Sequence, residues 1–155
     1  MIYRLVLAAA RVAACVVLLA VVSTAPASAV SASSYEKQVV SSTNAYRAEA
    51  GKVRVKMNKC VDRWANDQAR WMAARSTLQH RNGQLRKILR SCKLTGVSEN
   101  IAWNFPSGRK VVAAWAKSPG HARNMRASKM RYIGVGVARA SNGEIYVSQV
   151  FGTRK

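Results

Sequence analysis

The C-terminal part of the chain constrains the fold most, because its apolar residues alternate with a period of two. After Ser118-Pro119-Gly120, residues 132–138 place Ile and Val between glycines, which is the pattern of a β-strand. The run 141–144, Ser-Asn-Gly-Glu, predicts a type I′ hairpin turn, because Asn-Gly accepts positive φ angles. Residues 145–151 are then the returning strand. Gly134 and Gly136 leave one face of the first strand bare, which permits close approach of another backbone.

The preceding part of the chain shows helical spacing instead. Residues 35–50 form the first predicted helix, which ends before Gly51. Asn58 can cap a second helix, and residues 107–117 supply a third. The predicted inner faces are Val39, Val40, Thr43, Tyr46 and Ala50 in the first helix, Val61, Trp64, Ala65, Gln68 and Met72 in the second, and Val111, Val112 and Trp115 in the third. Helices followed by a terminal antiparallel hairpin imply an α+β layered domain.

The N-terminus has the features of an export signal. Arg4 precedes an apolar stretch that runs to Val22, and small residues follow around Ala27 and Ala29, where a signal peptidase needs them. We expect residues 1–29 to be removed, which predicts a secreted, extracellular protein. The mature chain would begin near Val30 with a flexible Ser/Ala-rich segment, residues 30–34, and continue as one domain over residues 35–155.

Two other interpretations of the N-terminus are weaker. A transmembrane anchor conflicts with Arg11, which leaves only about ten residues before Ser23, fewer than the roughly 20 that a spanning helix needs. A lipoprotein modified at Cys15 would leave the apolar residues 16–22 behind the lipid. We therefore expect no transmembrane segment in the mature protein, and we expect a monomer.

The cysteines fit an exported protein. Of the three in the chain, Cys15 lies in the expected signal, so Cys60 and Cys92 remain as an even pair in an oxidising compartment. We predict a disulfide between them, which would stabilise the fold by roughly 3 to 4 kcal/mol in the chain-entropy account. The alternative is two separate buried thiols.

The charge is strongly positive. The chain has 26 Lys and Arg against six Asp and Glu; without Arg4 and Arg11, 24 bases and a net charge of +18 remain. Such a charge implies acidic partners, although bases spread along the chain also suit a solvated, soluble surface. Trp71 and Trp103 are candidates for stacking on nucleic acid. No recognition motif accompanies them, and polyanion binding by counterion release is not selective.

A candidate site is indicated by residues that are rare in this chain. His80 and His121 are the only histidines, and Glu99 is the only acid between Asp67 and Glu144. A carboxylate beside imidazoles can fix a tautomer, act as a base or complete a metal site. Spacing alone leaves open a Glu paired with Arg and two structural histidines.

Six short runs bring a resemblance to a known family. They are Asn44-Ala45-Tyr46-Arg47, Leu78-Gln79-His80-Arg81, Ser98-Glu99-Asn100-Ile101-Ala102-Trp103, the stretch 114–125, the stretch 132–137, and Gln149-Val150-Phe151-Gly152. In order and spacing, over nearly all of the mature chain, they resemble the CAP superfamily of cysteine-rich secretory proteins, venom allergens and plant pathogenesis-related proteins, in its short bacterial form. The resemblance implies a three-layer α-β-α sandwich with a central, mainly antiparallel sheet and a strand near Glu99.

The resemblance also implies a cleft in which two histidines and two glutamates gather. His80 and His121 match the histidines and Glu99 matches one glutamate, while Ser98 replaces the usual glycine and Ser118 stands where many members carry the second glutamate. A three-member site neutralises a divalent cation less well. We expect no required cofactor, with a divalent metal on His80, Glu99 and His121 as the alternative.

We expect those three residues to converge within hydrogen-bonding or one-water distance. The carboxylate should raise the pKa of one histidine, and the surrounding cations should lower the pKa of the other.

Three functions remain to be weighed. The favoured one is a non-enzymatic binder of anionic cell-envelope polymers or lipids, acting through a basic surface and the His/Glu cleft. The second is an extracellular hydrolase using His80, Glu99 and His121, with Ser118 as a candidate nucleophile that lacks a Gly-x-Ser-x-Gly motif. The third is a non-specific nucleic-acid binder.

Overall fold

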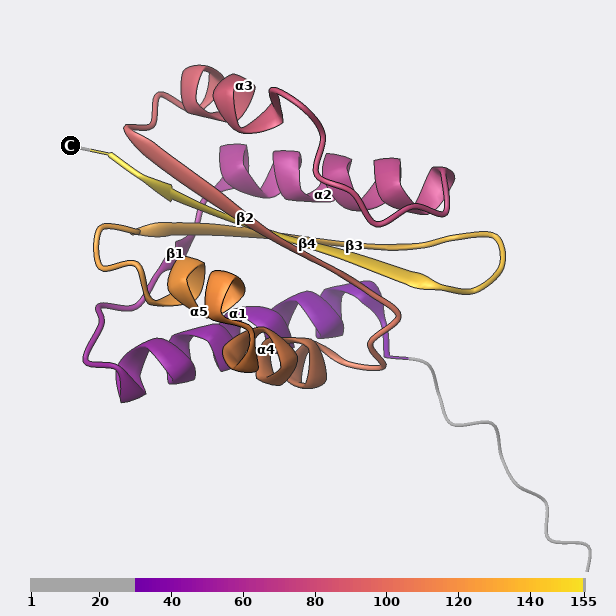
Figure 1. The fold of residues 1–155 in the computed structure, drawn as a ribbon, viewed down its shortest axis with the longest axis horizontal. Helices are drawn as coiled ribbons and strands as arrows, with labels where there is room; N and C mark the ends of the chain where they lie inside the picture. Colours follow the sequence, from indigo (N-terminus) through magenta and orange to yellow (C-terminus); the bar gives the residue numbers. More distant parts are fainter. Residues whose placement is uncertain (1–29, 155) are drawn as a thin grey trace, which may run out of the picture.

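The chain folds into three layers, with a sheet between two groups of helices (Figure 1). The computed structural model describes residues 30–154, so the expected signal peptide, residues 1–29 with Cys15, lies outside the described residues. The elements are α1 (Ala32–Glu49), β1 (Lys56–Met57), α2 (Lys59–Ala74), α3 (Gln84–Ser91), β2 (Gly96–Trp103), α4 (Gly108–Lys117), α5 (Pro119–Arg126), β3 (Tyr132–Arg139) and β4 (Ile145–Thr153). Helices α2 and α3 cover one face of the sheet and α1, α4 and α5 the other, which confirms the predicted α-β-α sandwich.

The sheet has the strand order β1-β3-β4-β2. Strand β1 runs parallel to β3, and the β3–β4 and β4–β2 pairs are antiparallel, so the prediction of a mainly antiparallel sheet is confirmed. Strand β2, which carries Glu99, pairs with β4 alone and therefore lies at one edge.

The terminal hairpin forms as predicted, but its turn is of another type. Within this turn only Gly143 has a positive φ, +88°. A type I′ turn requires a positive φ at Asn142 as well. The N–H of Gly143 donates to the carbonyl of Ala140, and the N–H of Ala140 donates to the carbonyl of Glu144. The loop therefore holds three residues, and the extra residue moves the left-handed position onto the glycine alone. The prediction of a type I′ turn was wrong.

The bare face of β3 receives the backbone of α2, as the two glycines predicted. A Cβ atom at Gly134 would lie 2.3 Å from the backbone nitrogen of Asp62, and one at Gly136 would lie 2.3 Å from the carbonyl oxygen of Ala65. No larger residue fits without moving the helix. This close contact fixes α2 on the sheet and brings the side chain of Asp62 to the outer side of β3.

The helices mostly follow the predicted spans. Asn58 caps α2 through Oδ1, which accepts from the N–H groups of Cys60 and Val61. Helix α1 begins earlier than expected, at Ala32, because Ser31 caps it by accepting from the N–H of Ser34. The expected flexible segment, residues 30–34, is therefore helical from residue 32. Ser118-Pro119-Gly120, where the helical pattern was expected to end, starts α5 instead, with proline at the first helical position.

The cores lie on both faces of the sheet. Trp115 of α4 packs with Val39 of α1 and Phe151 of β4 on one face, and Val61 and Ala65 of α2 pack against Val150 on the other. Trp64 is partly buried against this second cluster, as its place on the predicted face requires. No helix among the described residues is long and apolar enough to cross a membrane.

The buried face of α1 contains a residue that the apolar spacing did not identify. Arg47 is fully buried and has no carboxylate partner within the described residues. Its guanidinium donates to the carbonyl oxygens of Val53, Met125, Ala127 and Met130. Arg47 thereby joins the loop after α1 to the segment that connects α5 with β3.

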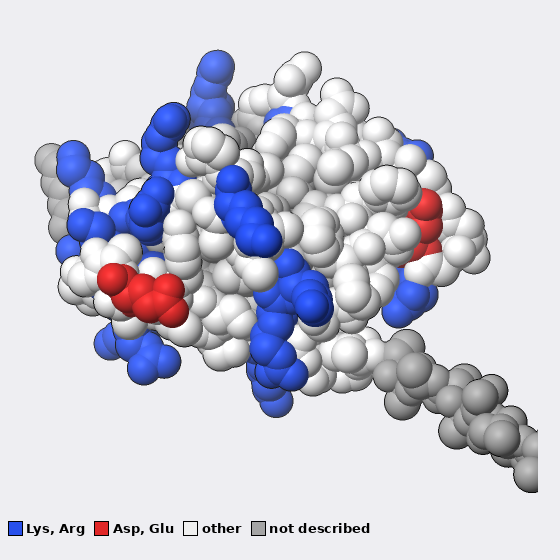
Figure 2. All heavy atoms as spheres, turned by 60° about the horizontal axis from the view of Figure 1, so that its bottom comes forward, with Lys and Arg blue, Asp and Glu red and all other residues white. Residues whose placement is uncertain are grey.

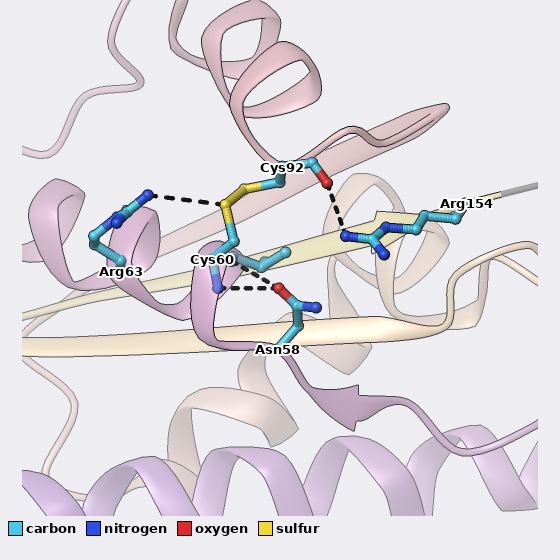
Figure 3. The surroundings of a disulfide bond; sticks show 6 residues. Asn58, Cys60, Arg63, Cys92 and Arg154 are labelled. Carbon is cyan, nitrogen blue, oxygen red and sulfur yellow. Dashed lines mark hydrogen bonds between the residues drawn. A yellow bond between two sulfur atoms is a disulfide. The ribbon is translucent and has the colours of Figure 1, made fainter.

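The disulfide between Cys60 and Cys92 is confirmed (Figure 3). Cys60 lies in the first turn of α2, and Cys92 ends α3 just before β2. The guanidinium of Arg154 donates to the carbonyl of Cys92 at 3.2 Å. The bond therefore ties α2 to the segment that leads into the strand of Glu99.

Candidate functional site

His80 and Glu99 form the central pair of the site. Glu99 lies on β2 with its side chain only 2% exposed, whereas the His80 side chain, on the connection between α2 and α3, is 58% exposed. Nδ1 of His80 lies 2.7 Å from Oε2 of Glu99. The hydroxyl of Ser148 on β4 donates to Oε1 of Glu99 at 3.2 Å. Both carboxylate oxygens are thus engaged, and an exposed imidazole is held by a buried acid.

His121 and Ser118 form a second, separate pair. Nδ1 of His121 lies 2.8 Å from Oγ of Ser118 within the first turn of α5. The His121 ring is tilted against Trp115, with ring centroids 6.2 Å apart. The hydrogen-bonded partner of this imidazole is therefore a hydroxyl, and the Glu99 carboxylate is engaged by His80 and Ser148 instead.

A buried amide network links the two pairs. Nδ2 of Asn124 on α5 donates to the carbonyl of Glu99 at 3.1 Å and to Oδ1 of Asn100 at 2.9 Å. Nδ2 of Asn100 donates to the carbonyl of His121 at 3.3 Å and to Oε1 of Gln149 at 2.9 Å. These amides hold the His121 segment against the backbone and side chains of β2 at Glu99 and Asn100.

No role for these amides was expected from the sequence, although Asn100, Asn124 and Gln149 all stand in the runs that carry the family resemblance. Asn100 and Gln149 are fully buried, and Nε2 of Gln149 donates onward to Oγ1 of the buried Thr43 at 2.8 Å. A buried amide must find hydrogen-bonding partners. The available signal was that Asn100 and Gln149 stand in segments that form buried strands.

The two histidines have pKa values displaced in opposite directions. The hydrogen bond to Glu99 raises the pKa of His80 above 6.5, against a smaller lowering by burial. Burial, and then the charge of His80, lower the pKa of His121. The directions agree with our expectation, but the main cause at His121 is burial rather than the surrounding cations.

A groove of about 430 Å³ opens beside the His80–Glu99 pair. Its remaining lining comes from α3 and the residues before it, and it combines basic with apolar side chains: Arg81, Asn82, Gly83, Leu85, Arg86 and Leu89. Arg81 is held by Asp67, with its Nη2 2.6 Å from Oδ2, whereas Arg86 is exposed. The groove thus offers cations and an apolar wall next to an imidazole that favours protonation.

The arrangement does not fit a three-ligand metal site. Within residues 30–154, no group of three or more His, Cys, Asp or Glu side chains is placed to hold a metal ion. His80 uses Nδ1 toward Glu99, and His121 uses Nδ1 toward Ser118. Both contacts use Nδ1 and leave Nε2 as the nitrogen that a metal would take, so a divalent ion bound by these histidines stays a prediction.

The site also lacks the acid–histidine–serine chain of hydrogen bonds that a serine hydrolase uses. A serine hydrolase needs its acid to orient the histidine that activates the serine. Here Ser118 lies against His121 while Glu99 lies against His80. The Ser118, His121 and Glu99 arrangement of the hydrolase alternative is therefore divided between two pairs.

The comparison with a protein family covers most of the domain. A profile described as CAP, the cysteine-rich secretory protein family, matches residues 40–151. The uncharacterized protein YkwD of Bacillus subtilis (strain 168) is 30% identical over 127 residues, which is 79% of this chain and 49% of YkwD. The chain thus spans about half the length of this relative.

Two of the solved structures with the same fold come from bacteria. An outer surface protein from Borrelia burgdorferi matches with a TM-score of 0.69 and 19% identity, over 77% of this chain and 92% of that one. An extracellular protein containing an SCP domain from Bacillus anthracis str. Ames matches with a TM-score of 0.68 and 21% identity, over 80% of this chain and 41% of that one. At these identities the likeness shows the fold.

Proposed function

The chain belongs to the CAP, or cysteine-rich secretory protein, family, and from this premise we propose that it is a secreted protein that binds anionic cell-envelope polymers or lipids without chemical turnover. The observation that carries the proposal is the groove of about 430 Å³ beside His80 and Glu99. Arg81 and Arg86 supply cationic groups there, and Leu85 and Leu89 supply an apolar wall. Acidic groups carried on a polymer or lipid backbone suit this combination.

The charge of the whole molecule supports the same partner class. The chain carries a net charge of +20, and Figure 2 shows the bases in separate groups over one face, with two small acidic areas among them. Spread cations attract a long polyanion from several directions, and the attraction falls as salt is added. The groove then selects the bound segment.

Secretion is supported by two observations. The disulfide between Cys60 and Cys92 is typical of proteins that fold in an oxidising compartment. The Bacillus anthracis protein of the same fold is described as extracellular. Both suit the export signal expected in residues 1–29.

The hydrolase alternative is not favoured, because Ser118 with His121 and Glu99 with His80 are separate pairs. Nucleic-acid binding stays a non-specific alternative. The guanidinium groups of Arg75 and Arg81 lie 4.9 and 5.5 Å from the centre of the Trp71 ring, which leaves this ring less available for base stacking. Trp103, 45% exposed, is the more accessible of the two candidates.

The test is capture by isolated cell envelope at physiological salt. Arg86→Ala removes one cation from the groove, and Arg109→Ala removes one exposed cation from α4. We expect Arg86→Ala to weaken binding about fivefold, as loss of about 1 kcal/mol predicts, and Arg109→Ala to change it less than twofold.

DNA of matched charge density serves as the competitor. Envelope polymer should be retained when DNA is in excess. Equal weakening by both substitutions, or full displacement by DNA, would mean that net charge alone drives binding and would contradict the proposal.

A further inference from the structure

The outer edge of β2 has a hydrogen-bonding pattern that can be worked out from its register. The N–H of Asn104 donates to the carbonyl of Ile145, which follows the β2–β4 register by one step. In an antiparallel pair, alternate residues bond to the neighbouring strand and those between turn their N–H and C=O groups away. Asn100 and Ala102 therefore bond to β4, and Glu99 and Ile101 direct their backbone groups outward.

Side-chain donors occupy the two outward carbonyl groups. Nδ2 of Asn124 donates to the carbonyl of Glu99 at 3.1 Å, and Nε1 of Trp115 donates to the carbonyl of Ile101 at 3.2 Å. For the outward N–H groups of these residues, the part of the chain that the structure describes provides no acceptor. Both residues are less than a tenth exposed, and a poorly exposed backbone N–H normally requires an acceptor.

The opposite side of the sheet shows which acceptor such N–H groups take in this protein. On the outer side of β3, the N–H of Val135 donates to Oδ1 of Asp62 at 3.1 Å. There the chain supplies an anionic oxygen atom from one of its own side chains.

The N–H groups of β2 lie between the two histidine segments. His80 contacts the Glu99 side chain on the α2 side of the sheet, and His121 contacts Asn100 on the α5 side. The Glu99 carboxylate faces His80 and Ser148, so it does not serve the outward N–H groups. A peptide strand cannot add to this edge as a full ladder, because the outward carbonyl groups are already bonded.

We propose that the outward N–H groups of Glu99 and Ile101 bind two successive oxyanions, phosphate or carboxylate, of an acidic polymer. The two donors are two residues apart, or about 7 Å along the strand, so one small anion cannot bond both in line while a polymer with recurring acidic groups can. This inference deepens the proposed function and rests on it.

The test uses amide NMR and hydrogen exchange on ¹⁵N-labelled protein. The probes are polyphosphate and polyglutamate of matched charge, with dextran as the uncharged control. We expect the amide protons of Glu99 and Ile101 to shift downfield, and their exchange to slow about tenfold at a probe concentration ten times its Kd. The amide of Val135, already bonded to the carboxylate of Asp62, is the internal control that should not change.

A pair of variants isolates the N–H group itself. Ile101→Pro removes the outward donor, and proline is tolerated on an edge strand where its nitrogen faces away from the ladder. Ile101→Val trims the same side chain but keeps the N–H. We expect Ile101→Pro to raise the Kd about fivefold or more relative to Ile101→Val. If Ile101→Pro does not fold, the amide measurement on the unmodified protein still decides.

Each outcome has a defined meaning. Changes at Glu99 and Ile101 with both polymers support a general oxyanion site, and changes with one polymer alone support the inference and identify the acidic group. Binding that leaves both amides unchanged overturns the inference but not the proposed function. Absence of binding to either polymer and to cell envelope overturns both.

Discussion

The outer sides of β3 and β2 expose the same backbone groups, but the chain treats them differently. Beyond β1, both outward groups of Val135 are bonded within the protein: its N–H donates to Asp62, and its carbonyl accepts from Asn66 at 3.3 Å. On β2 only the carbonyl groups of Glu99 and Ile101 have such partners among the described residues.

The difference separates a structural edge from a candidate binding edge. An unpaired strand edge can pair with a strand of another molecule, and proteins usually cover or block such edges. The β3 side is blocked by residues of α2, a helix packed directly onto glycines. The β2 side is blocked for carbonyl groups only, in the same region where the two histidines lie. We therefore propose binding at the β2 edge and not at the β3 edge, and the predictions below alter each side in turn.

The largest effect is expected from the disulfide, which joins α2, the helix that blocks β3, to the segment entering β2. Replacing Cys60 and Cys92 together by serine should lower the free energy of unfolding by about 3–4 kcal/mol, because the unfolded chain regains the freedom of a closed loop of 32 residues. Urea denaturation measures the change. A loss below about 1 kcal/mol would show that packing alone holds the two edges together.

Asp62→Ala should have the next largest effect. The substitution leaves the N–H of Val135 without its acceptor and removes the Oδ2 partner of Asn66, 3.2 Å away. We expect a loss of about 2 kcal/mol in unfolding free energy and faster hydrogen exchange at Val135. Glu49→Ala, which removes an exposed acid, is the matched control and should change stability by less than about 0.5 kcal/mol.

Trp115→Phe alters the β2 edge by a smaller amount. Phenylalanine keeps most of the buried ring but cannot donate to the carbonyl of Ile101. The unfolding free energy should fall by about 1 kcal/mol, measured by chemical denaturation. The same substitution at the exposed Trp103 is the control. Equal losses of unfolding free energy in the two variants would show that the hydrogen bond from the Trp115 indole to Ile101 does not stabilise the fold.

The smallest effect concerns the two histidines. NMR titration should place the pKa of His80 above 6.5 and that of His121 below it. Glu99→Gln should lower the first, because the carboxylate is lost, and raise the second, because His80 then carries less charge. The difference between the two pKa values therefore becomes smaller. Glu144→Gln, which changes an acid outside this site, should leave the two pKa values apart.

The sign of the resulting pH dependence differs between the rings. A raised folded pKa makes the His80 contribution to stability complete below pH 6.5, its ordinary pKa, and lost as pH rises through the higher folded value. A lowered folded pKa makes His121 destabilising as pH falls below 6.5 toward its folded value. Stability of Glu99→Gln should respond less to pH in the window just above 6.5 than that of the unmodified protein.

Local patterns along the chain were sufficient to predict several features of the fold. The period-two run of residues 132–138 predicted β3, and its glycines predicted the close approach of α2. Asn58 predicted a helix cap. The parity of the cysteines predicted their bond. The resemblance supplied the layered fold and the identity of the histidine and glutamate residues, because the order of motifs is preserved along the chain.

The hydrogen-bonding partners of these residues depend on how the layers pack, and local pattern did not predict them. Arg47 would be expected at the surface as a cation, yet it is buried against four carbonyl oxygens from distant segments. Glu99 bonds His80 rather than His121, and Ser118 takes the second histidine. The outward N–H groups of β2 follow from the strand register and from Asn124 and Trp115 on helices of one face. Such contacts join residues far apart in sequence, and their geometry depends on how the layers pack, which no local spacing encodes.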